Sequence, residues 1–181
     1  MHVKLPELTI LKIGLAVFVC LLITLARGAD PDQNTFYACI AAIITLKANI
    51  RDSFTAGWTR IKATIIGAVL GLVALEMQSA AHWQIDSLAY MLLLTAMVML
   101  ALWFASNVLR VEGVSLAGVA LLSVALNHAS DVSPFSFATH RVVDTSLGIV
   151  VALAVNAALP RTWKDFGGFL KLGQRKMKKE D

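Results

Sequence analysis

Two arginines, Arg60 and Arg141, begin matching segments of this chain. The segment RIKATIIG (60–67) and the segment RVVDTSLG (141–148) share Arg, Thr and Gly at the same spacings. An arginine guanidinium stays charged at physiological pH, and its planar fork of N–H donors matches a carboxylate. Two such groups that reach one path from opposite sides would attract organic anions, and this is the chemistry that the repeat indicates.

On a helix, the repeated residues fall at i, i+4, i+7 and i+11 and form one stripe. The stripes are Arg60, Thr64, Gly67 and Gly71 in the first segment, and Arg141, Thr145, Gly148 and Ala152 in the second. We predict that the arginines and threonines line a substrate pathway, and that Gly67, Gly71 and Gly148 allow helices to pack closely. The alternative is that the threonines only pack, and that each arginine, at the start of an apolar run, extends to the headgroups.

Two further charged residues belong to the candidate pathway. Asp144 lies one helical turn after Arg141, where its carboxylate would form a local ion pair or take part in proton coupling. Lys47 comes between two apolar runs, where it would either contribute to the anion path or anchor the helix at the headgroups. Both alternatives stay open for each residue.

The chain carries no pattern that is typical of an enzyme. Its histidines at 82, 128 and 140 are too widely spaced to suggest a metal site, and the motifs HExxH, GxSxG and the P-loop are absent. We therefore expect no catalytic residue, no metal and no cofactor. The net charge of +4 follows from membrane topology, so we do not expect nucleic-acid binding.

The elements that position these residues are predicted to be transmembrane helices. The chain is 57% apolar and only 15% charged, with a mean hydropathy of +0.71, whereas soluble domains carry roughly 25% charged residues. There are six apolar runs, at 8–26, 35–46, 63–75, 88–109, 114–126 and 145–159. The first and fourth are long enough to cross a hydrocarbon core, which takes about 20 helical residues. The other four require polar extensions, and flanking Lys and Arg residues supply them.

The basic residues set the expected orientation. With a cytoplasmic amino terminus and six spans, all but two of the 16 Lys and Arg residues fall on the inner side. The exceptions are Arg27 and Arg141, and the predicted outer loop at 76–87 contains neither Lys nor Arg. Both termini are therefore predicted to be cytoplasmic. A cleaved signal peptide is the alternative for the first run, but Arg27 stands where a cleavage site prefers a small residue.

The repeat also predicts the architecture. Each matching segment opens the third helix of a three-helix unit, and an odd number of crossings gives the two units opposite orientations. The fold class is thus an all-α integral membrane protein of six transmembrane helices in two inverted three-helix repeats, at about 8–81 and 85–159. We expect one membrane domain at 1–160, and a short basic cytoplasmic tail at 161–181 that binds anionic membrane lipids.

Several of these motifs together carry a resemblance to a known family. In the first half they are YACIAAIITL (37–46), followed by Asp52-Ser53, Gly57, Arg60, Thr64, Gly67 and Gly71. The second half, RVVDTSLGIVVALAVNAALP (141–160), follows the pattern R-x-x-D-T-x-x-G and ends in Asn and Pro. The combination resembles the aromatic acid exporter (ArAE) family, also called the fusaric acid resistance-like (FUSC) family.

The resemblance implies a six-helix unit in the bacterial inner membrane that exports organic carboxylate anions, aromatic ones included. It also implies kinship with plant aluminium-activated malate transporters, which are dimeric anion channels, and hence a homodimer with Arg60 and Arg141 in the anion path. The chain departs from larger relatives because only a short tail follows Pro160, where they carry a cytosolic domain or a second membrane unit. A passive organic-anion channel, and a scaffold that organises lipid without transport, are the alternatives.

Overall fold

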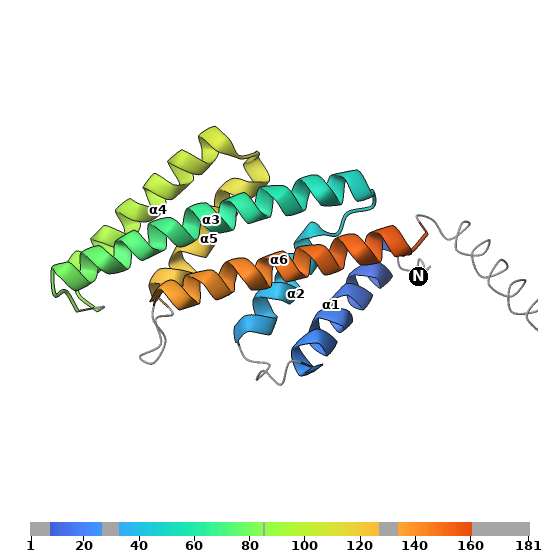
Figure 1. The fold of residues 1–181 in the computed structure, drawn as a ribbon. Coiled ribbons are helices and arrows are strands. Elements are labelled where there is room, and N and C mark those ends of the chain that lie inside the picture. Colours follow the sequence, from blue (N-terminus) through green and yellow to red (C-terminus); the bar gives the residue numbers. More distant parts are fainter. Residues whose placement is uncertain (1–7, 27–32, 85, 127–133, 161–181) are drawn as a thin grey trace, which may run out of the picture. The chain divides into compact units, whose positions relative to one another are not determined.

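The described part of the chain is built of helices alone. A computed structural model describes residues 8–26, 33–84, 86–126 and 134–160, and their regular structure is entirely helical, which confirms the all-α class. The helices are α1 (Leu8–Ala26), α2 (Gln33–Thr45), α3 (Ile50–Ala80), α4 (Leu88–Val108), α5 (Val111–Leu126) and α6 (Pro134–Ala158) (Figure 1). The predicted basic tail lies outside the described residues.

Four of these helices, α1, α3, α4 and α6, are long and apolar enough to cross a membrane. The helices α2 and α5 have 13 and 16 residues, which corresponds to about 20 and 24 Å at 1.5 Å per residue. Since the hydrocarbon core is about 30 Å thick, their crossing remains a prediction. The order long, short, longest nevertheless occurs in both halves of the sequence.

The third helix of each half begins well before its apolar run. α3 starts at Ile50 and α6 at Pro134, so Arg60 and Arg141 lie ten and seven residues inside continuous helices. At 1.5 Å per residue this is about 15 and 10 Å from the helix start. The expectation that each arginine sits at the start of a helix is therefore wrong. The polar turns that precede the apolar runs continue the helix because they contain no Pro or Gly that would end it before Arg60 or Arg141, apart from Gly57.

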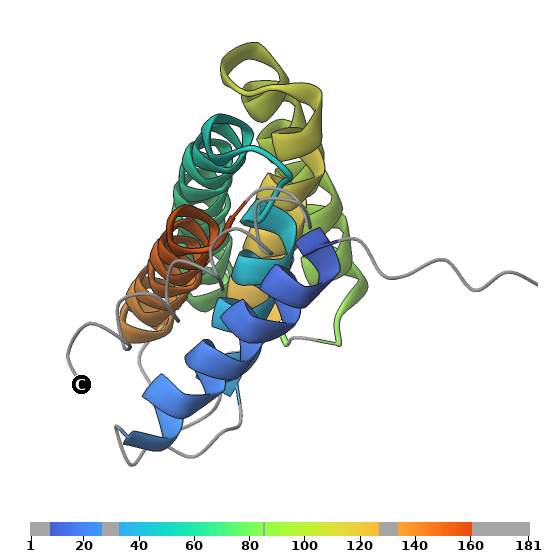
Figure 2. The same ribbon diagram turned by 90° about the vertical axis from the view of Figure 1, so that its right-hand side faces the viewer.

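Contacts divide the chain into two compact units. The first unit comprises 1–56 and 147–181, and the second comprises 57–146. In the first unit α1 packs along α2 (Figure 2), and both contribute to an apolar core that is completed by the second half of α6. Residues from the two ends of the sequence thus form one body.

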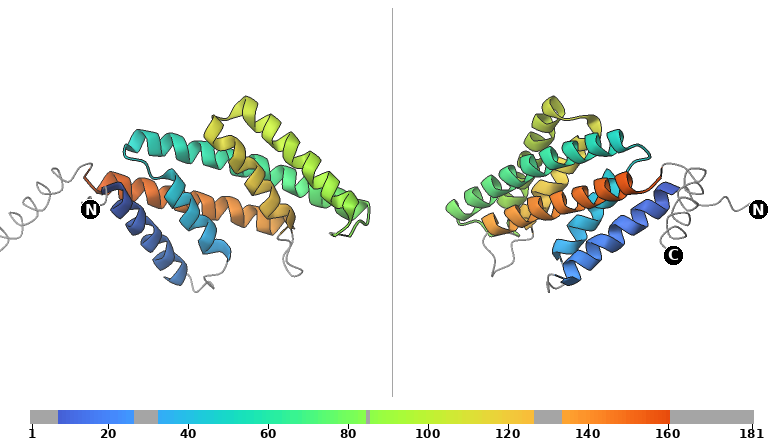
Figure 3. Two further views of the ribbon diagram at one scale, coloured as in Figure 1. Left: turned by 180° about the vertical axis from the view of Figure 1, so that it is seen from behind. Right: turned by 45° about the vertical axis from the view of Figure 1, so that its right-hand side comes forward.

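In the second unit, α4 and α5 pack as an antiparallel pair (Figure 3). Ser87 caps α4 by accepting a hydrogen bond from the backbone N–H of Tyr90 at 3.2 Å. The buried Tyr90 hydroxyl donates to the carbonyl oxygen of Ala125 on α5 at 2.8 Å, so its one polar atom is satisfied inside an apolar cluster.

α3 approaches α5 closely at two glycines of the second unit. A Cβ atom placed on Gly67 would overlap the carbonyl oxygen of Ala117 and lie 2.6 Å from the Cβ of Ala120. One placed on Gly71 would lie 3.0 Å from the carbonyl oxygen of Leu121. Only glycine fits at Gly67 without a shift of backbone, so this position sets the distance between the two helices.

The first unit contains a matching contact between α6 and α2. A Cβ atom on Gly148 would overlap the carbonyl oxygen of Ala38 and lie 2.8 Å from the Cβ of Ala41. As at Gly67, the neighbours are the carbonyl of one alanine and the side chain of another alanine three residues later. In both units the repeated glycine thus meets the short second helix of the opposite sequence half.

We predict that Gly67→Ala and Gly148→Ala each lower the free energy of unfolding by about 1–3 kcal/mol, because the added methyl group forces the paired helices apart. The measurement is thermal or denaturant unfolding of the detergent-solubilised protein. Gly14→Ala in α1 is the matched control, since nothing lies within 4 Å of a Cβ there, and the better helix propensity of alanine should leave stability equal or slightly higher. Equal effects at all three positions would contradict the close approach.

Candidate functional site

The second unit buries both repeated arginines. Arg60 is 8% exposed and Arg141 is 6% exposed, and they are near enough for their positive charges to repel each other. Two like charges in a low-dielectric interior raise the free energy of the folded protein unless an anion offsets them. The pair therefore has the electrostatics of an anion site.

The guanidinium of Arg60 also has unused donors. Its Nε and Nη1 are buried, and within the described part of the chain they have no hydrogen-bond partner. Arg141 and Asp144 each take part in an interaction of their own. Buried donors without partners are rare in native proteins, and one explanation for them is a ligand that is bound during function.

The remaining predicted pathway residues divide between the two units. Thr64, Thr145 and Asp144 belong to the second unit, as the arginines do, and all three are buried, at 6%, 3% and 9% exposure. Lys47 belongs to the first unit, and its side chain is exposed. Five of the six predicted pathway residues are therefore buried and belong to the second unit, whereas Lys47 is an exposed residue of the first.

A second polar centre, which the sequence analysis did not predict, lies in the first unit around Asn156 of α6. The Asn156 Oδ1 accepts a hydrogen bond from the ammonium group of Lys12 at 2.8 Å. Its Nδ2 donates to the carbonyl oxygen of Lys47 at 3.0 Å and to the hydroxyl of Ser53 at 2.9 Å. This one amide thus joins α1, the connection between α2 and α3, and the first turn of α3.

Ser53 completes this network. Its Oγ, which is fully buried, accepts from the backbone N–H of Lys47 at 2.8 Å and is placed to donate to the carbonyl oxygen of Asn49 at 3.1 Å. The network therefore satisfies the backbone groups that are left open where α2 ends and α3 begins. A buried polar network of this kind favours a single arrangement of its helices.

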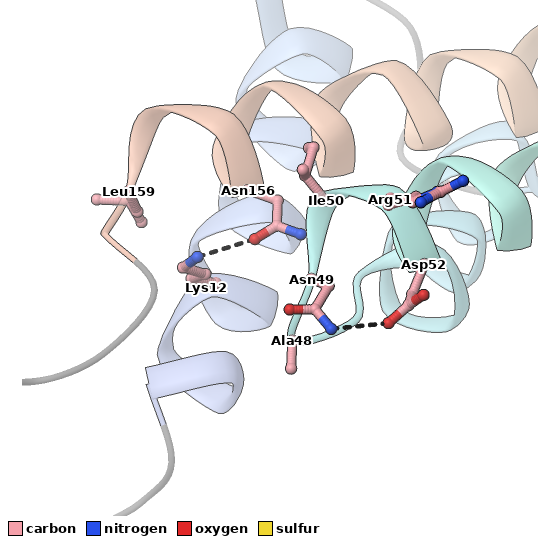
Figure 4. Close-up of a pocket in the computed structure, with 8 residues that line it drawn as sticks. All are labelled: Lys12, Ala48, Asn49, Ile50, Arg51, Asp52, Asn156 and Leu159. Atoms are coloured by element: carbon pink, nitrogen blue, oxygen red, sulfur yellow. Dashed lines mark hydrogen bonds between the residues drawn. The ribbon is translucent and has the colours of Figure 1, made fainter.

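The ammonium of Lys12 faces a cavity of about 360 Å³ at the same end of the first unit (Figure 4). Lys12 is 3% exposed, and no described residue pairs its charge with a carboxylate. Asn49 and Asp52 line the cavity as well, and the amide of Asn49 donates to Asp52 Oδ2 at 2.9 Å. The Oδ1 of Asn49 is buried and has no partner among the described residues.

The sequence did contain a signal for this centre. Lys12 and Asn156 are a charged and a polar side chain inside the first and last apolar runs, where such residues point to a functional site. The repeat could not reveal them, because the position of Asn156 in the second half corresponds to Leu75 in the first. No group of His, Cys, Asp and Glu that would hold a metal occurs among the described residues.

We predict that Asn156→Ala lowers the free energy of unfolding by about 1–3 kcal/mol or more, because it removes the hydrogen-bond acceptor of the buried Lys12 ammonium and one of the donors to the Lys47 carbonyl. Unfolding in detergent provides the measurement. Asn107→Ala is the control, since Asn107 is exposed and bonds only to Trp103 in its own helix, and it should change stability by less than about 0.5 kcal/mol. Comparable losses in the two variants would show that the network does not hold α1, α3 and α6 together.

Comparisons with known proteins identify one family. Residues 12–155 match a family described as fusaric acid resistance protein-like. The match includes both arginines and both polar centres except Asn156. No curated protein and no solved structure matches the chain.

Proposed function

Because the chain belongs to the fusaric acid resistance protein-like family, we propose that it is a membrane transporter that exports organic carboxylate anions, aromatic ones included. Fusaric acid is itself an aromatic carboxylic acid, and resistance to such a compound is what its efflux would produce. The four long apolar helices are consistent with a multi-pass membrane protein. The observation that carries the proposal is the burial of Arg60 and Arg141 in one unit.

In this proposal the two arginines attract the anion. The unpartnered Nε and Nη1 of Arg60 provide two donors for a carboxylate, and the positive charge of Arg141 adds to the attraction. Binding of an anion relieves the repulsion between the guanidiniums, which favours its entry. Thr64 and Thr145, on the same helix stripes, are proposed to offer hydroxyl donors, and Asp144 to limit the net positive charge.

The wider setting is also part of the proposal. The protein acts as a homodimer in the bacterial inner membrane with both termini in the cytoplasm, and the positions of the Lys and Arg residues support that orientation. The two short helices, α2 and α5, occupy corresponding places in the two halves. Paired short segments of this kind are the sequence feature that points to the binding site in inverted-repeat transporters.

We predict that Arg60→Ala and Arg141→Ala each reduce carboxylate flux by about tenfold or more, the loss expected for one charge-assisted hydrogen bond. Purified protein in liposomes loaded with benzoate provides the assay, with and without a proton gradient. For Arg60→Ala, loss of a buried like charge should not lower the melting temperature, and for Arg141→Ala the melting temperature is measured beside the flux, which separates a transport defect from misfolding. Arg110→Ala, at an exposed site between α4 and α5, is the control and should leave flux unchanged. Full flux in both buried-arginine variants would remove them from the path.

Cysteine accessibility tests whether the helix stripes line a solvated path. In a background where the two native cysteines are alanine, we expect Thr64→Cys and Thr145→Cys to react with a water-soluble thiol reagent, and benzoate to slow the reaction. The controls are Val69→Cys and Val150→Cys on the same helices, which face outward at 54% and 64% exposure. In a membrane these positions would meet lipid and react slowly. The same low reactivity at all four positions would favour a protein without a transport path.

A further inference from the structure

The first unit contains two adjoining cavities, of which one is polar and the other apolar. The first is the polar cavity that contains the Lys12 ammonium, together with Asn49, Arg51 and Asp52. The second is an apolar groove of about 560 Å³ along α1, lined by residues that include Leu8, Leu11, Leu15 and Phe18. Leu159 lines both cavities, so they meet at the end of α6.

The groove follows the outward face of α1. Leu11, Leu15 and Phe18 are 52%, 41% and 56% exposed, and they recur at the spacing of one helix face. Gly14 forms part of the same lining, and nothing lies within 4 Å of a Cβ placed there. The missing side chain leaves a hollow that is open to whatever surrounds the helix, which in a membrane is the acyl-chain layer.

The polar cavity lies near the described start of α1. Lys12 is the fifth residue of α1, about 6 Å along the axis from its first residue. The charges that line the cavity are Lys12 and Arg51 on the positive side and Asp52 on the negative side, so an anion is favoured. Asn49 Oδ1, buried and without a donor among the described residues, adds a place for a hydroxyl group of the ligand.

We propose that these two cavities together bind one phospholipid with an anionic, hydroxyl-bearing headgroup. The phosphate accepts hydrogen bonds from the Lys12 ammonium and lies near Arg51, a headgroup hydroxyl donates to Asn49 Oδ1, and one acyl chain occupies the groove beside Gly14. This lipid site is independent of the proposed transport activity. A free phosphate or a soluble carboxylate would share the polar contacts, but it would leave the apolar groove empty.

The test uses the full chain in detergent, titrated with phosphatidylglycerol or phosphatidylcholine, with the bound lipid counted by native mass spectrometry. We expect the wild type to retain phosphatidylglycerol in preference to phosphatidylcholine. Lys12→Gln, which keeps a donor for Asn156 and removes the charge, should weaken phosphatidylglycerol binding by about tenfold or more. Lys47→Gln, a change of the same charge at an exposed site of the same unit, should bind as the wild type does.

The groove is tested by a second pair of variants that does not touch the polar network. Gly14→Leu should fill the hollow, since nothing lies within 4 Å of a Cβ there, and should reduce phosphatidylglycerol binding, whereas Gly14→Ala should bind almost as the wild type does. Inorganic phosphate and glycerol 3-phosphate, added in excess, should not displace the lipid. Equal binding by wild type, Lys12→Gln and Gly14→Leu would overturn the proposal. Equal losses in Lys12→Gln and Lys47→Gln, or displacement by the soluble phosphates, would overturn it too.

Discussion

The close approach of paired helices at Gly67 and Gly148 is the constraint on which the rest of the structure depends. In a membrane, lipid competes with protein for apolar surface, so helices associate through packing between small residues rather than through hydrophobic burial. At both glycines the neighbouring backbone occupies the space that a side chain would need. Each glycine lies seven residues after its arginine, which is nearly two helical turns. Fixing each glycine against its partner helix therefore also restricts the direction in which the arginine projects from the same helix.

The Asn156 network and the pair of Arg60 and Arg141 differ in how far their buried polar atoms are hydrogen-bonded. Asn156 and Ser53 form a network in which donors and acceptors are matched across three helices, so the network stabilises the fold without a ligand. At Arg60, Nε and Nη1 are left without partners among the described residues, and the charge of Arg141 adds repulsion. The first centre specifies structure, whereas the second leaves two donors for the ligand that we propose.

The sequence predicted a large part of the fold, and the reason is periodic apolar composition. The six runs and the six observed helices coincide closely at α1, α2, α4 and α5. The starts of α3 and α6 were misjudged, because hydropathy marks where a helix is apolar and not where it begins. The same error made the arginines look like residues at helix ends.

The sequence could not predict which pathway residues are buried, because burial depends on the facing helices, which no single segment encodes. The buried ones are Arg60, Thr64, Arg141, Asp144 and Thr145. The Asn156 network was missed for a related reason, since its partners are more than a hundred residues away in the sequence and have no counterpart in the repeat.

Residues that differ between the two halves of the sequence point to function more clearly than the residues that the halves share. Gly67 and Gly148 make equivalent contacts, and close helix packing accounts for both without any function. Lys12 has no equivalent, yet it is a buried charge without a carboxylate among the described residues, and an apolar residue at its position would avoid the cost of burying a charge. Asn156 alone does not require that charge, because a neutral donor would serve its Oδ1 equally well. The positive charge of Lys12 therefore needs an explanation outside the network. The anion that we propose for the adjoining cavity would supply one, and the apolar groove along α1 is the reason for proposing a lipid.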